Sequence, residues 1–117
     1  MADTSIIKVS SKTASVGEMG QKYLASGKSL SMRMWEGDEP SKEAKPLIAR
    51  DYETCGYVIS GKAELHFDND EKVLLSPCDS WIVPKGAKHT YKILETFTAI
   101  EATHPPAEAK NRDAPVA

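Results

Sequence analysis

The clearest pattern in this sequence is a period of two in its apolar residues, which begins at Leu30. Over residues 30–35 the two faces of the chain differ, with Leu30, Met32 and Met34 alternating with Ser31, Arg33 and Trp35. Residues 63–68 repeat the pattern, with Ala63, Leu65 and Phe67 alternating with Glu64, His66 and Asp68. Such alternation is typical of β-strands with two different faces. No segment has the period of about 3.6 residues that marks an amphipathic helix, so the pattern predicts an all-β chain.

Turn residues divide this pattern into short strands. Gly, Pro, Asn and Asp follow nearly every apolar run, at Gly61 and at residues 68–71, 77–79 and 84–86. The charged and proline-containing residues 36–46 are predicted to form an exposed loop. The expected strands are residues 30–35, 54–59, 63–67, 72–75, 81–83, 89–94 and 97–103. Short strands at spacings of about 8–12 residues predict a sandwich or a barrel.

The two ends of the chain differ from this central region. Residues 1–29 are predicted to form an N-terminal arm with edge strands, residues 30–103 a barrel, and residues 104–117 a loosely ordered tail rich in Pro and Ala. Ile6 and Ile7 form an apolar patch in the arm. Either the arm adds a strand to a sheet edge or to a second subunit, or it is a frayed terminus. We expect a homodimer that uses the arm or a sheet face.

The composition restricts the partners and the compartment. The 117 residues are enough for one hydrophobic core but not for two. A net charge of −2, with acids and bases interspersed, argues against a nucleic-acid partner. No apolar run approaches the roughly 20 residues of a membrane helix. The N-terminus lacks the pattern of a signal peptide, so a cytoplasmic protein with Cys55 and Cys78 reduced is expected.

One segment carries a recognisable combination of residues. The run PCDSWIVPKGAKH, residues 77–89, ends in a histidine just after a Pro-x-Gly turn, and GYVISGKAEL precedes it at residues 56–65. This order of strand, glycine turn, hairpin and P-x-G-x-x-H resembles the small single-domain cupins. Pro84, Gly86 and His89 match the second cupin motif, and Gly61 matches the last glycine of the first. The resemblance covers roughly residues 30–103 and implies a double-stranded β-helix, or jelly-roll barrel.

The departures from the family pattern fall on its metal ligands. The resemblance implies a site of three histidines and one glutamate, which suits Fe, Mn, Ni or Zn. Ile48 and Arg50 stand at two of the histidine positions and Thr54 at the glutamate position, which leaves His89 alone. Because a catalytic metal site commonly has about three protein ligands, no metal cofactor is predicted. The alternative is a divalent metal held by His89 together with Asp51, Glu53 or His66.

Arg50 changes the chemistry expected of this position. Its guanidinium is charged at every physiological pH, accepts no hydrogen bond and cannot ligate a metal. At a former ligand position it repels cations and favours a carboxylate or phosphate. The alternative is a solvated ion pair with Asp51 or Glu53 at the barrel rim.

The remaining candidates follow from strand alternation. His89 and Tyr91 share one strand face and are the candidate catalytic residues, as a general acid or base. The alternative is a core histidine held by a hydrogen bond. Arg33 and Trp35 also share a face; inside the barrel they supply an anion contact and a flat wall, and outside it Trp35 is a dimer contact. The ligand-binding candidates are therefore Arg33, Trp35, Arg50, Glu53, His89 and Tyr91.

Three classes of function remain open at this stage. The first, which we favour, is a barrel that binds a small anionic or sugar-like molecule without the usual metal. The second is an enzyme, either a metal-free isomerase or lyase that uses His89 and Tyr91 or a metalloenzyme with atypical ligands. The third is a structural or regulatory dimeric barrel. The resemblance does not decide among them, because one fold hosts many functions.

Overall fold

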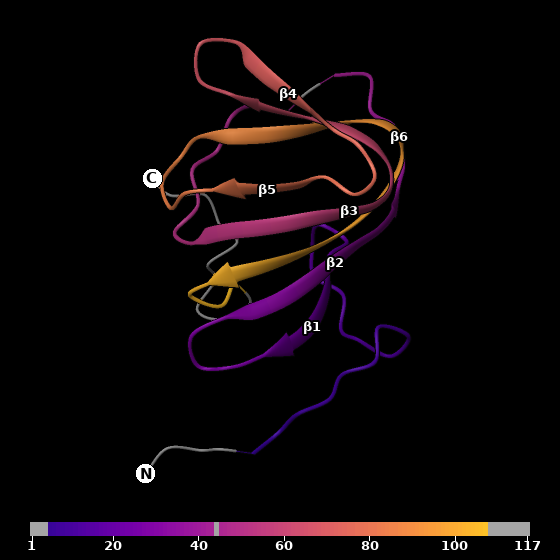
Figure 1. The fold of residues 1–117 in the computed structure, drawn as a ribbon, viewed down its shortest axis with the longest axis vertical. Helices are drawn as coiled ribbons and strands as arrows, with labels where there is room; N and C mark the ends of the chain where they lie inside the picture. Colours follow the sequence, from indigo (N-terminus) through magenta and orange to yellow (C-terminus); the bar gives the residue numbers. More distant parts are fainter. Residues whose placement is uncertain (1–4, 44, 108–117) are drawn as a thin grey trace.

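The computed structural model describes residues 5–43 and 45–107, whose regular structure consists of strands alone. No helix in these ranges is long and apolar enough to cross a membrane. Six strands follow one another along the chain (Figure 1): β1 (Lys22–Ser26), β2 (Ser31–Asp38), β3 (Glu53–Phe67), β4 (Glu71–Leu75), β5 (Ser80–Val83) and β6 (His89–His104).

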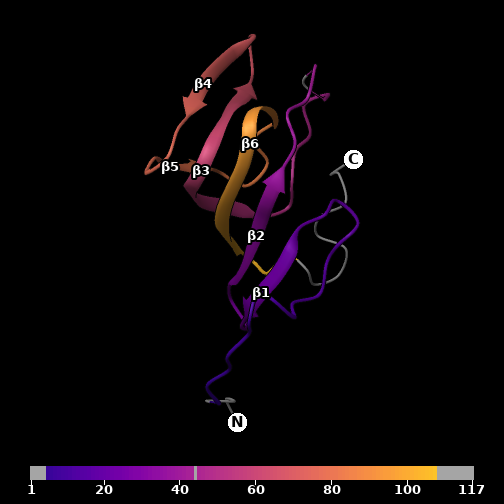
Figure 2. The ribbon, with the colours of Figure 1, turned by 90° about the vertical axis from the view of Figure 1, so that its right-hand side faces the viewer.

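All the strand pairs are antiparallel, in the order β1-β2-β6-β3-β4, with β5 also paired to β3. The two long strands, β3 and β6, pair along their whole length. The first half of β3 pairs with the second half of β6, from Glu53 with His104 to Val58 with Ala99. The second half of β3 pairs with the first half of β6, from Ala63 with Ile93 to Phe67 with His89. Between these halves both strands bend, so the sheet curves around an interior (Figures 1 and 2).

The bend differs from the turn predicted at residues 60–62. The predicted strands 54–59 and 63–67 are one continuous strand, β3, and the predicted strands 89–94 and 97–103 are one continuous strand, β6. Gly61 has a φ of 82° at the bend, and a Cβ there would lie 2.0 Å from the carbonyl oxygen of Thr96. The glycine therefore lets the two backbones approach where the strands bend, instead of reversing the chain.

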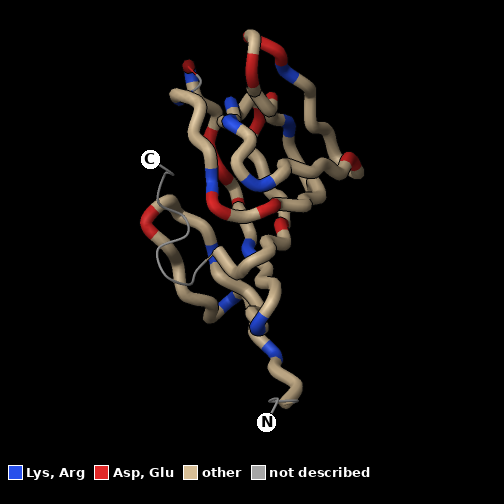
Figure 3. The backbone as a smooth tube through the Cα atoms, turned by 90° about the vertical axis from the view of Figure 1, so that its left-hand side faces the viewer, with Lys and Arg blue, Asp and Glu red and all other residues tan. Residues whose placement is uncertain are grey.

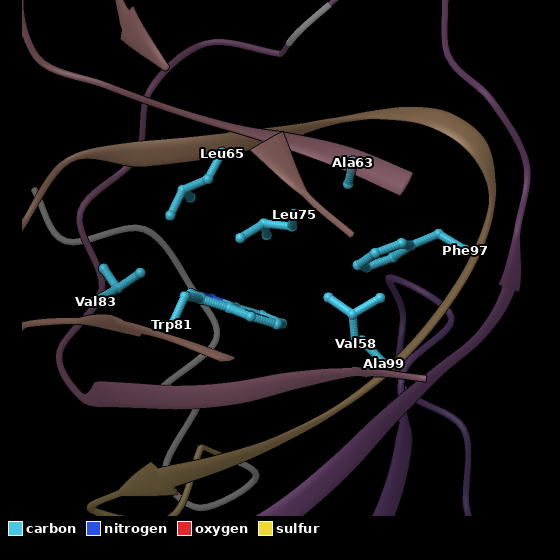
Figure 4. Packing of buried hydrophobic residues seen from close by; sticks show 8 residues of the cluster. All are labelled: Val58, Ala63, Leu65, Leu75, Trp81, Val83, Phe97 and Ala99. Carbon is cyan, nitrogen blue, oxygen red and sulfur yellow. The ribbon is translucent and has the colours of Figure 1, made fainter. Parts of the chain in front are cut away.

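The core lies between the two layers that this bend creates. Eight buried side chains point toward one another there (Figure 4): Val58, Ala63, Leu65, Leu75, Trp81, Val83, Phe97 and Ala99. Ala63 and Leu65 are buried while Glu64 and His66 are half-buried on the other side of the strand, in agreement with the predicted alternation. The core thus comes from inward positions of β3, β4, β5 and β6.

The first and last described residues do not belong to this core cluster. Residues 5–10 extend away from the barrel (Figure 1), and the side chain of Ile6 is 99% exposed. At the other end Pro106 and Ala107 are buried against the barrel, and the rest of the predicted tail lies outside the described residues. Cys55 and Cys78 are exposed free thiols. Acidic and basic residues are interspersed over the backbone (Figure 3).

Candidate functional site

The barrel contains a cavity of about 350 Å³ next to the core. Its lining comes from β2, the segment between β2 and β3, the start of β5, and β6. Aromatic and apolar side chains make up much of its wall: Trp35, Ile48, Tyr52, Trp81, Tyr91, Ile93 and Phe97. A concave, largely apolar wall with a few polar groups is typical of a small-molecule site.

The segment before β3 is placed in the wall by backbone pairing. Ile48 and His89 form an isolated antiparallel bridge. The amide nitrogen of Ile48 lies 3.0 Å from the carbonyl oxygen of His89, and the amide nitrogen of His89 lies 3.1 Å from the carbonyl oxygen of Ile48. The amide of Gly86 donates to the carbonyl oxygen of Arg50 at 3.0 Å. Ile48, Arg50 and Tyr52 therefore face the cavity with a period of two, opposite His89.

A buried carboxylate on β6 organises one wall of the cavity. Glu101 is 2% exposed and Arg33 is 6% exposed. Oε1 of Glu101 accepts hydrogen bonds from Nε of Arg33 at 2.8 Å and from Nε1 of Trp35 at 2.6 Å. Nη2 of Arg33 donates to the hydroxyl of Tyr52 at 3.1 Å, and its guanidinium lies 5.3 Å from the ring centres of both Trp35 and Tyr52. Arg33 is thus neutralised by Glu101 and fixed between two aromatic rings.

Tyr91 is held by its neighbours in the same wall. Its hydroxyl accepts a hydrogen bond from Nε1 of Trp81 at 3.2 Å and directs its own proton toward Oε2 of Glu101 at 3.5 Å. Burial, followed by the charge of Glu101, raises the pKa of Tyr91 well above 10.0. The phenol therefore stays protonated at physiological pH, with its proton turned toward the carboxylate.

His89 lines the cavity, and one of its ring nitrogens is bonded to the backbone. Its Nδ1 lies 2.9 Å from the carbonyl oxygen of Ala87, which can only accept, so Nδ1 carries a proton. In the neutral ring Nε2 is then an acceptor. Burial lowers the pKa of His89 below 6.5, and the positive charges of Arg50 and Arg33 lower it further. The hydrogen bond to Ala87 and the negative charge of Glu101 oppose this shift without reversing it. His89 is therefore a neutral base near pH 7.

Arg50 differs from Arg33 in that no ion pair of its guanidinium is found among the described residues. Its Nη2 contacts the sulfur of Met19 at 3.6 Å. Its Nη1 is buried and has no hydrogen-bond partner among residues 5–43 and 45–107. A buried donor of this kind is costly unless an acceptor reaches it, and the cost is larger for a charged group.

The mouth of the cavity has a different character. Its exposed lining residues are Met19, Glu39, Ser41, Glu43 and Lys45. The loop that carries most of them is attached to β6, because Ser41 donates its amide to Ile93 at 3.0 Å and accepts the Ile93 amide on its hydroxyl at 3.2 Å. Polar residues therefore surround the opening, and aromatic residues line the interior.

The structure brings together five of the six ligand-binding candidates from the sequence. Arg33, Trp35, Arg50, His89 and Tyr91 all line the cavity. Glu53 does not: it is exposed at the start of β3, because alternation turns it away from the inward Tyr52 and Thr54. Trp35 lies on the inner face, where it is half-buried and contacts Arg33 and Glu101.

Sequence reasoning missed Glu101, Tyr52 and Asp38 as cavity residues. Glu101 could have been found, because it shares the inward phase of β6 with Phe97 and Ala99. A carboxylate in that phase is buried and needs a cation. Tyr52 lies just before β3 and Asp38 follows an irregularity in β2. Strand alternation therefore does not predict that their side chains face the cavity.

Comparison with known proteins identifies the family. Residues 34–100 match the family described as "Cupin domain". The match covers more than half of the chain, and the chain therefore belongs to the cupin domain family. It is a small single-domain cupin. No protein of curated function matches the sequence.

Solved structures of similar fold come from several organisms. An RmlC-like cupin from Shewanella frigidimarina is 18% identical, with a TM-score of 0.72 over 86% of this chain and 92% of that one. KdgF from a Halomonas species is 26% identical, with a TM-score of 0.62 over 73% of this chain and 78% of that one. The polyketide cyclase RemF from Streptomyces resistomycificus is 14% identical, with a TM-score of 0.68 over 87% of this chain and 83% of that one. These proteins share the jelly-roll fold but are named for different functions, so the structural similarity does not assign an activity to this chain.

The metal that the cupin resemblance implies does not fit the side chains at this site. Ile48 and Arg50 face the cavity next to His89, and neither is a metal ligand. The other proposed ligands lie elsewhere: Asp51 is ion-paired with Lys85 at 3.2 Å, Glu53 is exposed, and His66 is bonded to Glu64 at 3.1 Å. Within the described ranges no group of three or more His, Cys, Asp or Glu side chains is placed to hold a metal ion.

Proposed function

We propose that this cupin binds a small organic carboxylate in its barrel, without the metal that its family resemblance implies. The observation that carries the proposal is the position of Arg50 on the cavity wall, as a half-buried guanidinium whose Nη1 has no hydrogen-bond partner among the described residues. A carboxylate oxygen satisfies such a donor with a charge-assisted hydrogen bond. Arg33 does not compete for this role, because Glu101 neutralises it.

The cavity walls support a ligand with an apolar or aromatic body. Trp35, Trp81 and Tyr91 offer flat surfaces, and the volume of about 350 Å³ matches a small molecule. A cavity of this size also favours a binding role over a barrel that is only structural.

Isothermal titration calorimetry with a matched pair of probes tests the proposal. 4-Methylbenzoate carries a carboxylate, and 4-methylbenzamide has nearly the same shape without the charge. We expect the protein to prefer the benzoate, and Arg50→Gln to lower the benzoate affinity by roughly tenfold to a hundredfold, as loss of a hydrogen bond to a charged group implies.

Lys62→Gln is the matched control for charge. Lys62 pairs with Glu95 on the surface at 3.6 Å and is not among the cavity-lining residues, so its loss removes one positive charge outside the lining. Equal affinities for benzoate and benzamide, or an unchanged benzoate affinity in Arg50→Gln, would contradict the proposal.

A second candidate function is metal-free proton transfer, and the geometry of His89 favours it. The Ala87 carbonyl fixes the tautomer, so that Nε2 of this cavity-lining histidine is left as the basic nitrogen. A general base should have its pKa near or below the working pH, and burial lowers the pKa of His89. The proton of Tyr91 is turned toward Glu101, so we assign the proton chemistry to His89 alone.

Exchange of carbon-bound protons for deuterium tests this candidate. 2-Oxobutyrate has acidic protons next to its carbonyl group, and NMR in D₂O follows their loss. If His89 removes such a proton, the wild type accelerates exchange and His89→Gln does not. Exchange at the uncatalysed rate with the wild type, under conditions where 2-oxobutyrate is shown to bind, would rule out this reaction for that substrate.

A further inference from the structure

The cavity lining carries charged groups of both signs. Glu101 neutralises Arg33, whereas Nη1 of Arg50 has no hydrogen-bond partner among the described residues. The lining also contains the half-buried carboxylate of Asp38, the exposed carboxylates of Glu39 and Glu43, and the exposed ammonium group of Lys45. The cavity wall therefore presents a half-buried cation, Arg50, and a half-buried anion, Asp38.

A β-bulge aims one of these carboxylates into the cavity. Trp35 pairs with Ala99 and Asp38 pairs with Phe97, so residues 36 and 37 together stand opposite Thr98. Gly37 adopts a φ of 66° there, and its amide donates to Oγ1 of Thr98 at 3.0 Å. The extra residue shifts the alternation by one, and Asp38 lines the cavity on the same side as Trp35.

Asp38 is partly desolvated in this position. It is half-buried at the end of β2, in contrast to the exposed Glu39 that follows it. Burial raises the pKa of Asp38, and the charge of Lys45 opposes that shift. A cationic group placed beside it would relieve the cost of burying the carboxylate, as any opposite charge does.

We propose that the cavity selects a zwitterionic ligand, with its carboxylate on Arg50 and its ammonium group on Asp38. This inference rests on the proposed function, because it uses the same carboxylate contact. It adds the second charged group and the orientation of the ligand. The apolar walls between the two poles are suited to the uncharged middle of such a molecule.

Calorimetry with probes that differ by one ammonium group tests the proposal. The rigid pair is 4-(aminomethyl)benzoate and 4-methylbenzoate, and the flexible pair is 6-aminohexanoate and hexanoate. We expect the better-fitting amino compound to bind about tenfold more tightly than its parent, as one partly buried charge pair implies. Asp38→Asn should remove this preference and strengthen the binding of 4-methylbenzoate, because a like charge is lost.

Asp68→Asn is the matched control, since Asp68 is exposed in the hairpin turn before β4 and does not line the cavity. It should leave the preference intact. If both parent carboxylates bind at least as tightly as their amino derivatives, the zwitterion inference is wrong, while the proposed carboxylate site stands. If no carboxylate binds more tightly than 4-methylbenzamide, the proposed function itself fails.

Discussion

At the scale of single residues, the chemistry of this cupin depends on which side chains share the cavity with His89. Ile48 and Arg50 face it across the backbone bridge, where the family resemblance implies two more histidines. Ile48 is apolar and Arg50 is permanently charged, so neither can coordinate a metal as a neutral histidine does. We therefore expect the position that holds a cation in the family pattern to favour an anion in this chain.

Among the charged residues of the site, we expect substitution of Glu101 to lower the stability of the fold the most. Its side chain is 1% exposed and its partner Arg33 is 8% exposed, so Glu101→Gln leaves a buried guanidinium without its counter-charge. We expect the free energy of unfolding, measured with urea, to fall by about 3–5 kcal/mol. Glu95→Gln, which breaks an exposed pair with Lys62, should have little effect. A small change in Glu101→Gln would mean that solvent reaches this pair.

His89 should make stability depend on pH. Its pKa in the folded protein lies below the ordinary value of 6.5, so below that pH the unfolded chain binds more protons than the folded one. The contribution of His89 to stability is therefore complete above about pH 6.5 and declines as the pH falls toward the folded pKa.

Urea unfolding at pH 7.5 and pH 5.5 measures this effect. The wild type should lose more stability over this interval than His89→Gln, which has no imidazole to protonate. An NMR titration gives the folded pKa directly. Titration of His89 at or above pH 6.5 would contradict the burial described for its ring.

Part of the site was within reach of sequence reasoning. The period of two in residues 89–93 placed His89 and Tyr91 on one face, and both line the cavity. The sequence left open whether Arg33 and Trp35 face inward, because the other face of β2 carries Met32 and Met34 and is no less apolar. Only the partner Glu101, which is distant in sequence, explains the inward direction of Arg33.

At the scale of elements, the bend in β3 and β6 creates the barrel. Strand positions were predictable from alternation, but the continuity of each long strand was not, because Ser60-Gly61-Lys62 is equally compatible with a tight turn. The contact of Gly61 with Thr96 links residues far apart in sequence. The bulge at residues 36 and 37 is likewise specified by pairing with β6, and it lies inside a charged segment predicted to be a loop.

Gly61 and Gly86 form a natural pair of tests for this bend. Both have a positive φ, 82° and 83°, but a Cβ on Gly61 would overlap the backbone of Thr96 while nothing lies within 4 Å of one on Gly86. Gly61→Ala should lower the free energy of unfolding by about 2–5 kcal/mol. Gly86→Ala should cost about 1–2 kcal/mol. Equal losses in urea unfolding would mean that backbone conformation, and not the close approach, requires glycine at the bend.

At the scale of the whole molecule, one outer face of the sheet is apolar. Tyr57, Ile59 and Ile82 are 44%, 48% and 58% exposed at outward positions of β3 and β5. Exposed apolar groups of this extent are characteristic of an interface. These side chains carry no charge, so two copies of the face can meet without like-charge repulsion, and we expect a homodimer through it.

Light scattering after size exclusion tests the dimer. The wild type should have twice the chain mass of 12.8 kDa, and Ile82→Lys should have the single-chain mass. A variant without residues 1–10 should stay dimeric if the sheet face is the interface. A dimer lost on removal of the arm would assign the interface to Ile6 and Ile7 instead, and a monomeric wild type would contradict the homodimer altogether.

The central claim is that this barrel holds a carboxylate on Arg50 where its family resemblance implies a metal. The most direct measurement is a crystal structure with 4-methylbenzoate of protein purified without chelator. We predict a carboxylate oxygen at about 2.8 Å from a guanidinium nitrogen of Arg50. We also predict no anomalous scattering peak at Nε2 of His89. A metal ion bound to His89, or Arg50 turned out to solvent with the benzoate elsewhere, would contradict the account.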